Sequence, residues 1–202
     1  MAFIRTVPVE TADATVAEIY DEDRASWGFV PNFTKTFAHR PDVYRAWQQL
    51  NATIKSSMDL RRYELATVAA AGALRSSYCT LAHGRVLAEQ VMGAESVIRF
   101  LTDRTTAPLD AAERAVVAFA EKVALGADRM TQADVDELRA QGLDDEEILD
   151  VALAAGARCF FSKVLDATGT EPDAAFQDLD PALREALTVG RPIEDPLRRT
   201  ER

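Results

Sequence analysis

Two residues that can perform thiol chemistry stand one helical turn apart in this chain. Cys79 is one of two cysteines and His83 one of two histidines in 202 residues, and four positions separate them. On a helix such a pair lies on one face. Glu64 lies one apolar segment upstream, so it would come from the preceding helix. A thiol, an imidazole and a carboxylate placed in this way are the groups of an activated-cysteine site.

The start of the helix that carries Cys79 would favour the ionised sulfur. Ser76 or Ser77 can cap this helix, which puts Cys79 in its first turn. The positive end of the helix dipole there stabilises a thiolate, the reactive form of cysteine. His83 could take or relay the proton, and Glu64 could orient His83 or hold a bridging water. The alternative is a small buried cysteine beside a hydrogen-bonded helical histidine, because this spacing alone has little specificity.

The elements that must position these residues all have helical patterns. Alanine is abundant, aromatic residues make up 7%, and no alternating strand pattern stands out. We therefore expect an all-α, single-domain bundle of about eight helices, in which a two-helix hairpin carries the site. The expected helices cover residues 11–26, 41–58, 59–75, 76–91, 94–101, 110–125, 131–141 and 144–168, with a further short one at 33–38.

Local signals give more detail at both ends of the chain. Thr11 can cap the first helix, and the loop WGFVPNF should pack over the core or over a neighbouring subunit. Capping boxes predict three later helix starts, at Asp110/Glu113, Thr131/Asp134 and Asp144/Glu147. The helix over 144–168 is apolar almost all round, so we expect it to be buried centrally. We assign residues 1–175 to the helical domain and residues 176–202 to an irregular tail that could lie on a partner subunit.

Composition excludes several classes of partner and cofactor. The net charge of −10 argues against nucleic acid and anionic membranes, and its simplest role is solubility. The longest apolar run is too short to span a bilayer, and no secretory leader is recognisable, so we expect a cytoplasmic protein. In that reducing compartment a disulfide would be catalytic or redox-sensing. No GxGxxG or P-loop motif occurs, and we expect neither metal nor cofactor.

The segment ELATVAAAGALRSSYCTLAHG resembles the core motif of the alkylhydroperoxidase D family, which is related to the carboxymuconolactone decarboxylases. That motif is a glutamate, eleven residues, Cys-x-x-Cys, three residues and a histidine, and Glu64, Cys79 and His83 fit its spacing. PNFTKTFAHRPDVYRAW and RCFFSKVLDATGTEPD resemble flanking parts of the peroxidase-related branch, so the similarity covers roughly residues 25–176. The resemblance implies an all-α fold, assembly as a homo-oligomer (trimer or hexamer), and reduction of hydroperoxides.

One departure from the family motif changes the expected chemistry. In the family the second cysteine attacks the peroxide and the first resolves the sulfenic acid as a disulfide. Cys79 matches the attacking position, but Ser76 occupies the resolving one and cannot form a disulfide. A sulfenate on Cys79 would then need another thiol or would over-oxidise. Ser76 remains a helix cap or a hydrogen-bond donor to the thiolate, and Tyr78 fits the family's variation and is expected to line the pocket.

Three functional hypotheses stay open. The favoured one is thiol-dependent peroxide reduction by Cys79, with Glu64 and His83 as a proton relay. An external thiol would resolve the oxidised cysteine, or Cys159 would if its helix packs close enough. The second is a non-redox, decarboxylase- or isomerase-like enzyme that acts on a small acid, with His83 and Glu64 as acid and base. The third is a catalytically silent binding or assembly protein that keeps the fold.

Overall fold

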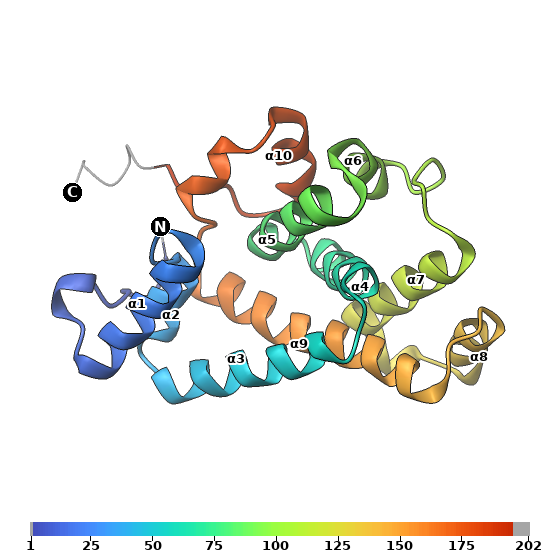
Figure 1. Cartoon of the computed structure of the whole chain (residues 1–202), viewed down its shortest axis with the longest axis horizontal. Coiled ribbons are helices and arrows are strands. Elements are labelled where there is room, and N and C mark those ends of the chain that lie inside the picture. The colour runs from blue at the N-terminus through green and yellow to red at the C-terminus, as the bar shows by residue number, and fades with distance from the viewer. Residues whose placement is uncertain (1, 196–202) are drawn as a thin grey trace.

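The computed structural model describes residues 2–195, and within them every regular element is helical (Figure 1). This confirms the all-α prediction, although ten α-helices replace the expected eight or so. They are α1 (Ala14–Trp27), α2 (Asn32–Phe37), α3 (Pro41–Ser56), α4 (Leu60–Ala73), α5 (Ser77–Leu87), α6 (Ala94–Thr102), α7 (Ala111–Gly126), α8 (Gln132–Ala140), α9 (Asp145–Thr168) and α10 (Pro181–Leu187). None of the helices in this part of the chain is long and apolar enough to cross a membrane.

The predicted capping boxes are found in the structure, whereas the single caps predicted at Thr11 and Ser76 are not. The boxes predicted for α7 and α9 are complete, and at α8 the backbone N–H of Thr131 donates to Asp134 Oδ2 over 2.7 Å. The prediction for α1 is wrong, because Asp13 rather than Thr11 accepts the N–H of Val16, over 2.9 Å. The reason is a 3-10 turn over Val9–Thr11, which delays the start of the helix and leaves Thr11 inside that turn.

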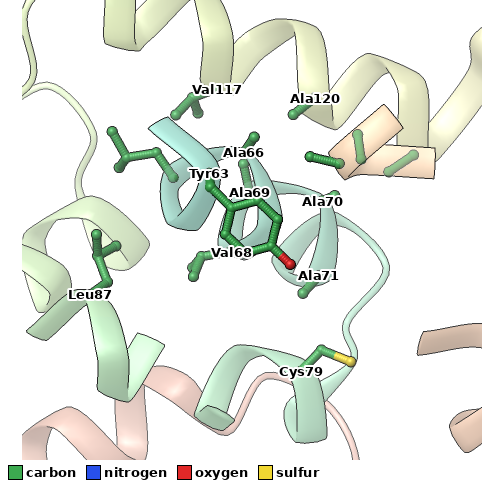
Figure 2. Close-up of a cluster of buried hydrophobic side chains, with 14 of the residues drawn as sticks. Tyr63, Ala66, Val68, Ala69, Ala70, Ala71, Cys79, Leu87, Val117 and Ala120 are labelled. Carbon is green, nitrogen blue, oxygen red and sulfur yellow. The ribbon is translucent and has the colours of Figure 1, made fainter. Parts of the chain in front are cut away.

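Helix α4 is the centre of the molecule, with α5, α7 and α9 packed around it (Figures 1 and 2). Residues 63–71 of α4 are all buried, and four of these nine are alanines. Small side chains let neighbouring helices approach closely, and a densely packed interior resists displacement. Helix α5 follows α4 after a short turn in which Arg75 adopts a left-handed conformation with φ of 57°. The α4–α5 hairpin is therefore a rigid support for side chains on both helices.

Helix α9 is less enclosed than its sequence suggests. One side packs against α3, α4 and α7 and buries Arg158, Ser162 and Leu165. Its position against the core agrees with the expected central burial, but on its other side Leu149 and Phe160 are 56% and 44% exposed. Within residues 2–195, other helices cover only one side of α9. The apolar composition of α9 does not predict which side that is. The WGFVPNF loop does pack on the core of its own chain, where Phe33 meets Phe161 of α9 edge to face at 5.4 Å.

The C-terminal segment joins the core instead of forming an irregular tail. Residues 174–178 form a 3-10 turn and α10 follows, with Leu187 fully buried. The hydroxyl of Thr80 donates to the carbonyl of Leu187 over 2.5 Å, and the N–H of Gly190 donates to Ser77 Oγ over 2.7 Å. These bonds attach the segment to the start of α5 within the same chain. Residues 196–202 of the expected tail lie outside the described residues.

Candidate functional site

The α4–α5 hairpin brings Glu64 and His83 into direct contact. Glu64 Oε2 lies 2.7 Å from His83 Nδ1, and the glutamate side chain is 1% exposed. Burial lowers the pKa of His83, the positive charge of Arg158 lowers it further, and Glu64 opposes both. His83 is therefore neutral near pH 7. A neutral imidazole that donates from Nδ1 keeps Nε2 as an acceptor, which is the state a general base requires.

Cys79 lies one turn before His83 on the same helix and is 1% exposed. Ser76 is the N-cap residue of α5, yet its side chain makes no hydrogen bond to the first turn. The hydroxyl lies beside Asp166, whose pKa is raised by burial and lowered again in part by this contact. The first-turn N–H groups of α5 thus have no side-chain acceptor, which leaves the positive end of the helix facing Cys79.

Arg158 is the site residue that the sequence analysis missed. It enters from α9, is 3% exposed, and donates from Nη1 to Cys79 Sγ over 3.6 Å. Burial works against the charged form, but negative charge at Cys79, and after it at Tyr63 and Glu64, raises the pKa of Arg158. Its Nε is buried without a hydrogen-bond partner in the described part of the chain. A signal was available, because Arg158 is the one charged residue between positions 151 and 162.

Lys55 places a second positive charge on the other side of the glutamate. Its Nζ lies 3.8 Å from Glu64 Oε1 and 5.7 Å from the centre of the Tyr63 ring, and its side chain is about half exposed. Glu64 Oε1 itself has no hydrogen-bond partner among the described residues. One oxygen of Glu64 thus serves His83, while the other is free to accept a hydrogen bond from a water molecule or a substrate.

Tyr78 and Cys159 are placed differently from the other predicted residues. The hydroxyl of Tyr78 donates to Asp173 and accepts the N–H of Phe33 over 3.3 Å, so it ties α5 to α2 rather than serving the sulfur. Cys159 follows Arg158 on α9, is partly buried, and is a free thiol like Cys79. Burial raises the pKa of the Cys159 thiol.

Glu64, Cys79, His83 and Arg158 form two hydrogen-bonded pairs drawn from three helices, and the charge of Arg158 is felt at His83 in the other pair. The guanidinium can stabilise a negative sulfur, and the imidazole can accept a proton while the carboxylate holds its ring. Aromatic rings surround the cation, with Phe161 at 5.7 Å and Trp47 at 5.9 Å from its centre. Such apolar walls exclude water and strengthen the charge interactions within the site. No group of three or more metal-binding side chains occurs within residues 2–195.

Comparison with known proteins identifies a matching family model and similar solved structures. Residues 41–122, which include three of these four residues, match the model of the carboxymuconolactone decarboxylase family. Among solved structures, a peroxidase-related protein from Ralstonia eutropha JMP134 with an alkylhydroperoxidase AhpD core is 24% identical, with 87% of this chain and 94% of that chain covered at a TM-score of 0.78. A peroxidase-related protein from Silicibacter sp. TM1040 is also 24% identical, with 87% and 91% covered at a TM-score of 0.69.

A third similar structure comes from a protein with a different activity. It is a cysteine-to-alanine variant of the debrominase Bmp8 in complex with 2,3,4-tribromopyrrole, 18% identical, with 93% of this chain and 98% of that chain covered at a TM-score of 0.73. No curated protein matches the chain significantly. At these identities the structural likeness establishes the fold and leaves the reaction open.

Proposed function

We propose that this chain, whose residues 41–122 match the carboxymuconolactone decarboxylase family model and whose fold is alkylhydroperoxidase D-like, reduces a small hydroperoxide at Cys79 with an external thiol as reductant. The observation that carries the proposal is the buried guanidinium of Arg158 on Cys79 Sγ. A neutral thiol would not balance the charge of this buried cation. A thiolate would, and the thiolate is the form of cysteine that reacts with peroxides. The buried pair of Glu64 and His83 supplies a place for the proton.

The reaction assigns a role to each residue. His83 takes the thiol proton at Nε2, and Arg158 stabilises the resulting thiolate. The sulfur attacks the outer oxygen of the hydroperoxide, the O–O bond breaks, and the sulfur loses two electrons to the peroxide. His83 returns its proton to the departing alkoxide, which leaves as an alcohol, or as water from hydrogen peroxide. Glu64 fixes the imidazole ring and its tautomer through Nδ1.

The test is the consumption of hydrogen peroxide in the presence of a thiol reductant. We expect turnover by the unmodified chain and by Cys159→Ser, because Cys159 lies outside the relay. Cys79→Ser is expected to remove turnover, since serine keeps the size of the side chain but not its nucleophilicity. A peroxide consumption rate no higher than that of Cys79→Ser would refute the proposal.

A second candidate is acid–base chemistry on a small organic acid that leaves the sulfur unused. The buried Glu64–His83 pair favours it, because this pair can move a proton without Cys79. The family is named for a decarboxylase, and the debrominase Bmp8 carries other chemistry on the same fold. Activity towards a panel of small carboxylic acids that survives in Cys79→Ala would identify this reaction. Its loss in Cys79→Ala would assign the site to thiol chemistry.

We further propose that the chain assembles as a homo-oligomer, with a trimer or hexamer expected. Support comes from large apolar side chains that remain exposed along α3 and α9, namely Val43, Leu50, Leu149, Leu153 and Phe160. Contiguous apolar surface of this kind is typical of interfaces. Light scattering on the purified protein measures the assembly directly, and a monomer at micromolar concentration would contradict the proposal.

A further inference from the structure

Arg158 is a buried cation for which the described residues provide one hydrogen-bond partner, the sulfur of Cys79. No carboxylate of residues 2–195 forms an ion pair with this guanidinium, while its Nη1 lies 3.6 Å from Sγ. Burying a cation without a counter-charge is costly. The site therefore favours a negative charge at Cys79 both before and after the sulfur is oxidised.

The guanidinium also has donor capacity to spare. Arginine carries five N–H donors in one rigid plane, and the Nε–H of Arg158 is buried without a partner. An oxygen atom bonded to Cys79 Sγ would be a stronger acceptor for the Arg158 guanidinium than the sulfur to which it now donates. Charge-assisted hydrogen bonds from a guanidinium to an anionic oxygen are among the stronger ones in proteins. The oxidised sulfur is thus expected to be held more firmly than the reduced one.

No thiol of the chain is placed to remove that oxygen. Ser76 contributes a hydroxyl where a resolving sulfur would be needed. Cys159 follows Arg158 directly, and neighbouring residues on an α-helix point about 100° apart. With Arg158 directed at Cys79, Cys159 points elsewhere. Burial also raises the pKa of the Cys159 thiol, so little of its attacking thiolate form exists near pH 7.

Access to the sulfur is narrow. Cys79 is 1% exposed, and α4 and α9 pack against the helix that carries it. A mixed disulfide requires two sulfur atoms at a separation of about 2 Å. The cysteine of a protein reductant would have to enter this covered interior, whereas a free low-molecular-weight thiol carries no protein surface with it.

From these observations we infer that peroxide converts Cys79 to a sulfenate anion paired with Arg158. We infer also that a low-molecular-weight thiol reduces this sulfenate. This rests on the proposed peroxide reduction. The thiolate takes one oxygen from the hydroperoxide, and the sulfur is oxidised by two electrons as the alcohol leaves. One thiol molecule then attacks the sulfenate sulfur and forms a mixed disulfide, while the oxygen leaves as water with the proton of that thiol and one from the site. A second thiol displaces the Cys79 thiolate and leaves as the oxidised low-molecular-weight disulfide.

The experiment follows the intact mass of the protein after one equivalent of hydrogen peroxide, in the unmodified chain, Arg158→Lys and Arg158→Met. We expect the unmodified chain to hold one added oxygen that a 1,3-dicarbonyl probe traps as sulfenic acid. When a second equivalent of hydrogen peroxide is then added, the single-oxygen form of Arg158→Met is expected to be oxidised to the two-oxygen form about tenfold faster than that of the unmodified chain, the size of effect of one charge-assisted hydrogen bond. Arg158→Lys keeps a cation and is expected to lie between them. Circular dichroism of each variant verifies the fold.

The reductant is tested on the unmodified chain, so this part depends on no substitution. Reduced glutathione is expected to restore the free thiol of Cys79 at least about tenfold faster than reduced thioredoxin at equal thiol concentration, because burial hinders the larger thiol. Equal or faster repair by thioredoxin would overturn the inference, as would a Cys79–Cys159 disulfide or an equal rate of the second oxidation in Arg158→Met. A Cys79 that gains no oxygen at all would refute the proposed function itself, which distinguishes the two failures.

Discussion

Removal of the charge of Arg158 should slow the alkylation of Cys79 by about a hundredfold near pH 7. At the 3.6 Å that separates Nη1 from Sγ, and with an effective dielectric constant of about 20, Coulomb's law gives roughly 5 kcal/mol between the guanidinium and a thiolate. Water that enters beside a smaller side chain offsets part of this energy. If about half is lost, the rate of alkylation falls by a factor of about one hundred.

The assay compares iodoacetamide alkylation in a Cys159→Ser background, where Cys79 is the one remaining thiol. Arg158→Met keeps much of the apolar bulk and removes the charge. Arg158→Lys is the matched control, because it retains the charge but loses the planar fork, so its rate should fall by less than about tenfold. Alkylation of Arg158→Met at the rate of the parent chain, with its fold intact, would show that the cation does not activate the sulfur.

Three further outcomes test other parts of the structure. Glu64→Gln keeps the shape but weakens the hold on His83, so peroxide turnover should fall by about ten- to a hundredfold in a steady-state assay. Burial raises the pKa of Asp173 to about 6, so the folded state keeps a proton that the unfolded state loses above about pH 4. Stability should therefore fall by about 3 kcal/mol between pH 4 and 6 relative to Asp173→Asn, measured by urea unfolding; parallel curves would contradict this. A Cβ on Gly190 would lie 1.9 Å from the carbonyl oxygen of Arg75, so Gly190→Ala should cost roughly 1–3 kcal/mol in thermal unfolding. Gly156→Ala, where nothing lies within 4 Å, is the control and should not destabilise the protein.

The parts of the fold that could be predicted from sequence depend on local chemistry. The boxes at Asp110/Glu113 and Asp144/Glu147 satisfy helix N–H groups within one turn, so no tertiary information is needed to recognise them. The approach of Glu64 to His83 follows from a short turn between two helices and from helical spacing. These interactions lie within about twenty residues of sequence, which explains why a pattern can reveal them.

The features that were missed depend on how distant segments pack. The sequence of α9 is apolar on almost every side, so it does not indicate which side is exposed. For the same reason Arg158 was not recognised as a site residue, although its neighbours in the sequence are uncharged. Helix α10 has a recognisable start, since Asp180 accepts the N–H of Leu183 over 3.1 Å and Pro181 follows it. Its burial, however, depends on α5, about a hundred residues earlier in the chain.

The hydrogen bonds that join Leu187 to Thr80 and Gly190 to Ser77 affect the protein while it is being synthesised. Synthesis proceeds from the N-terminus, so the ribosome completes Cys79 more than a hundred residues before Leu187, which packs on the same helix. A nascent chain therefore carries Cys79 on a helix whose neighbouring face is not yet packed. Damage to this sulfur should accumulate chiefly in chains that stall or are truncated before residue 187.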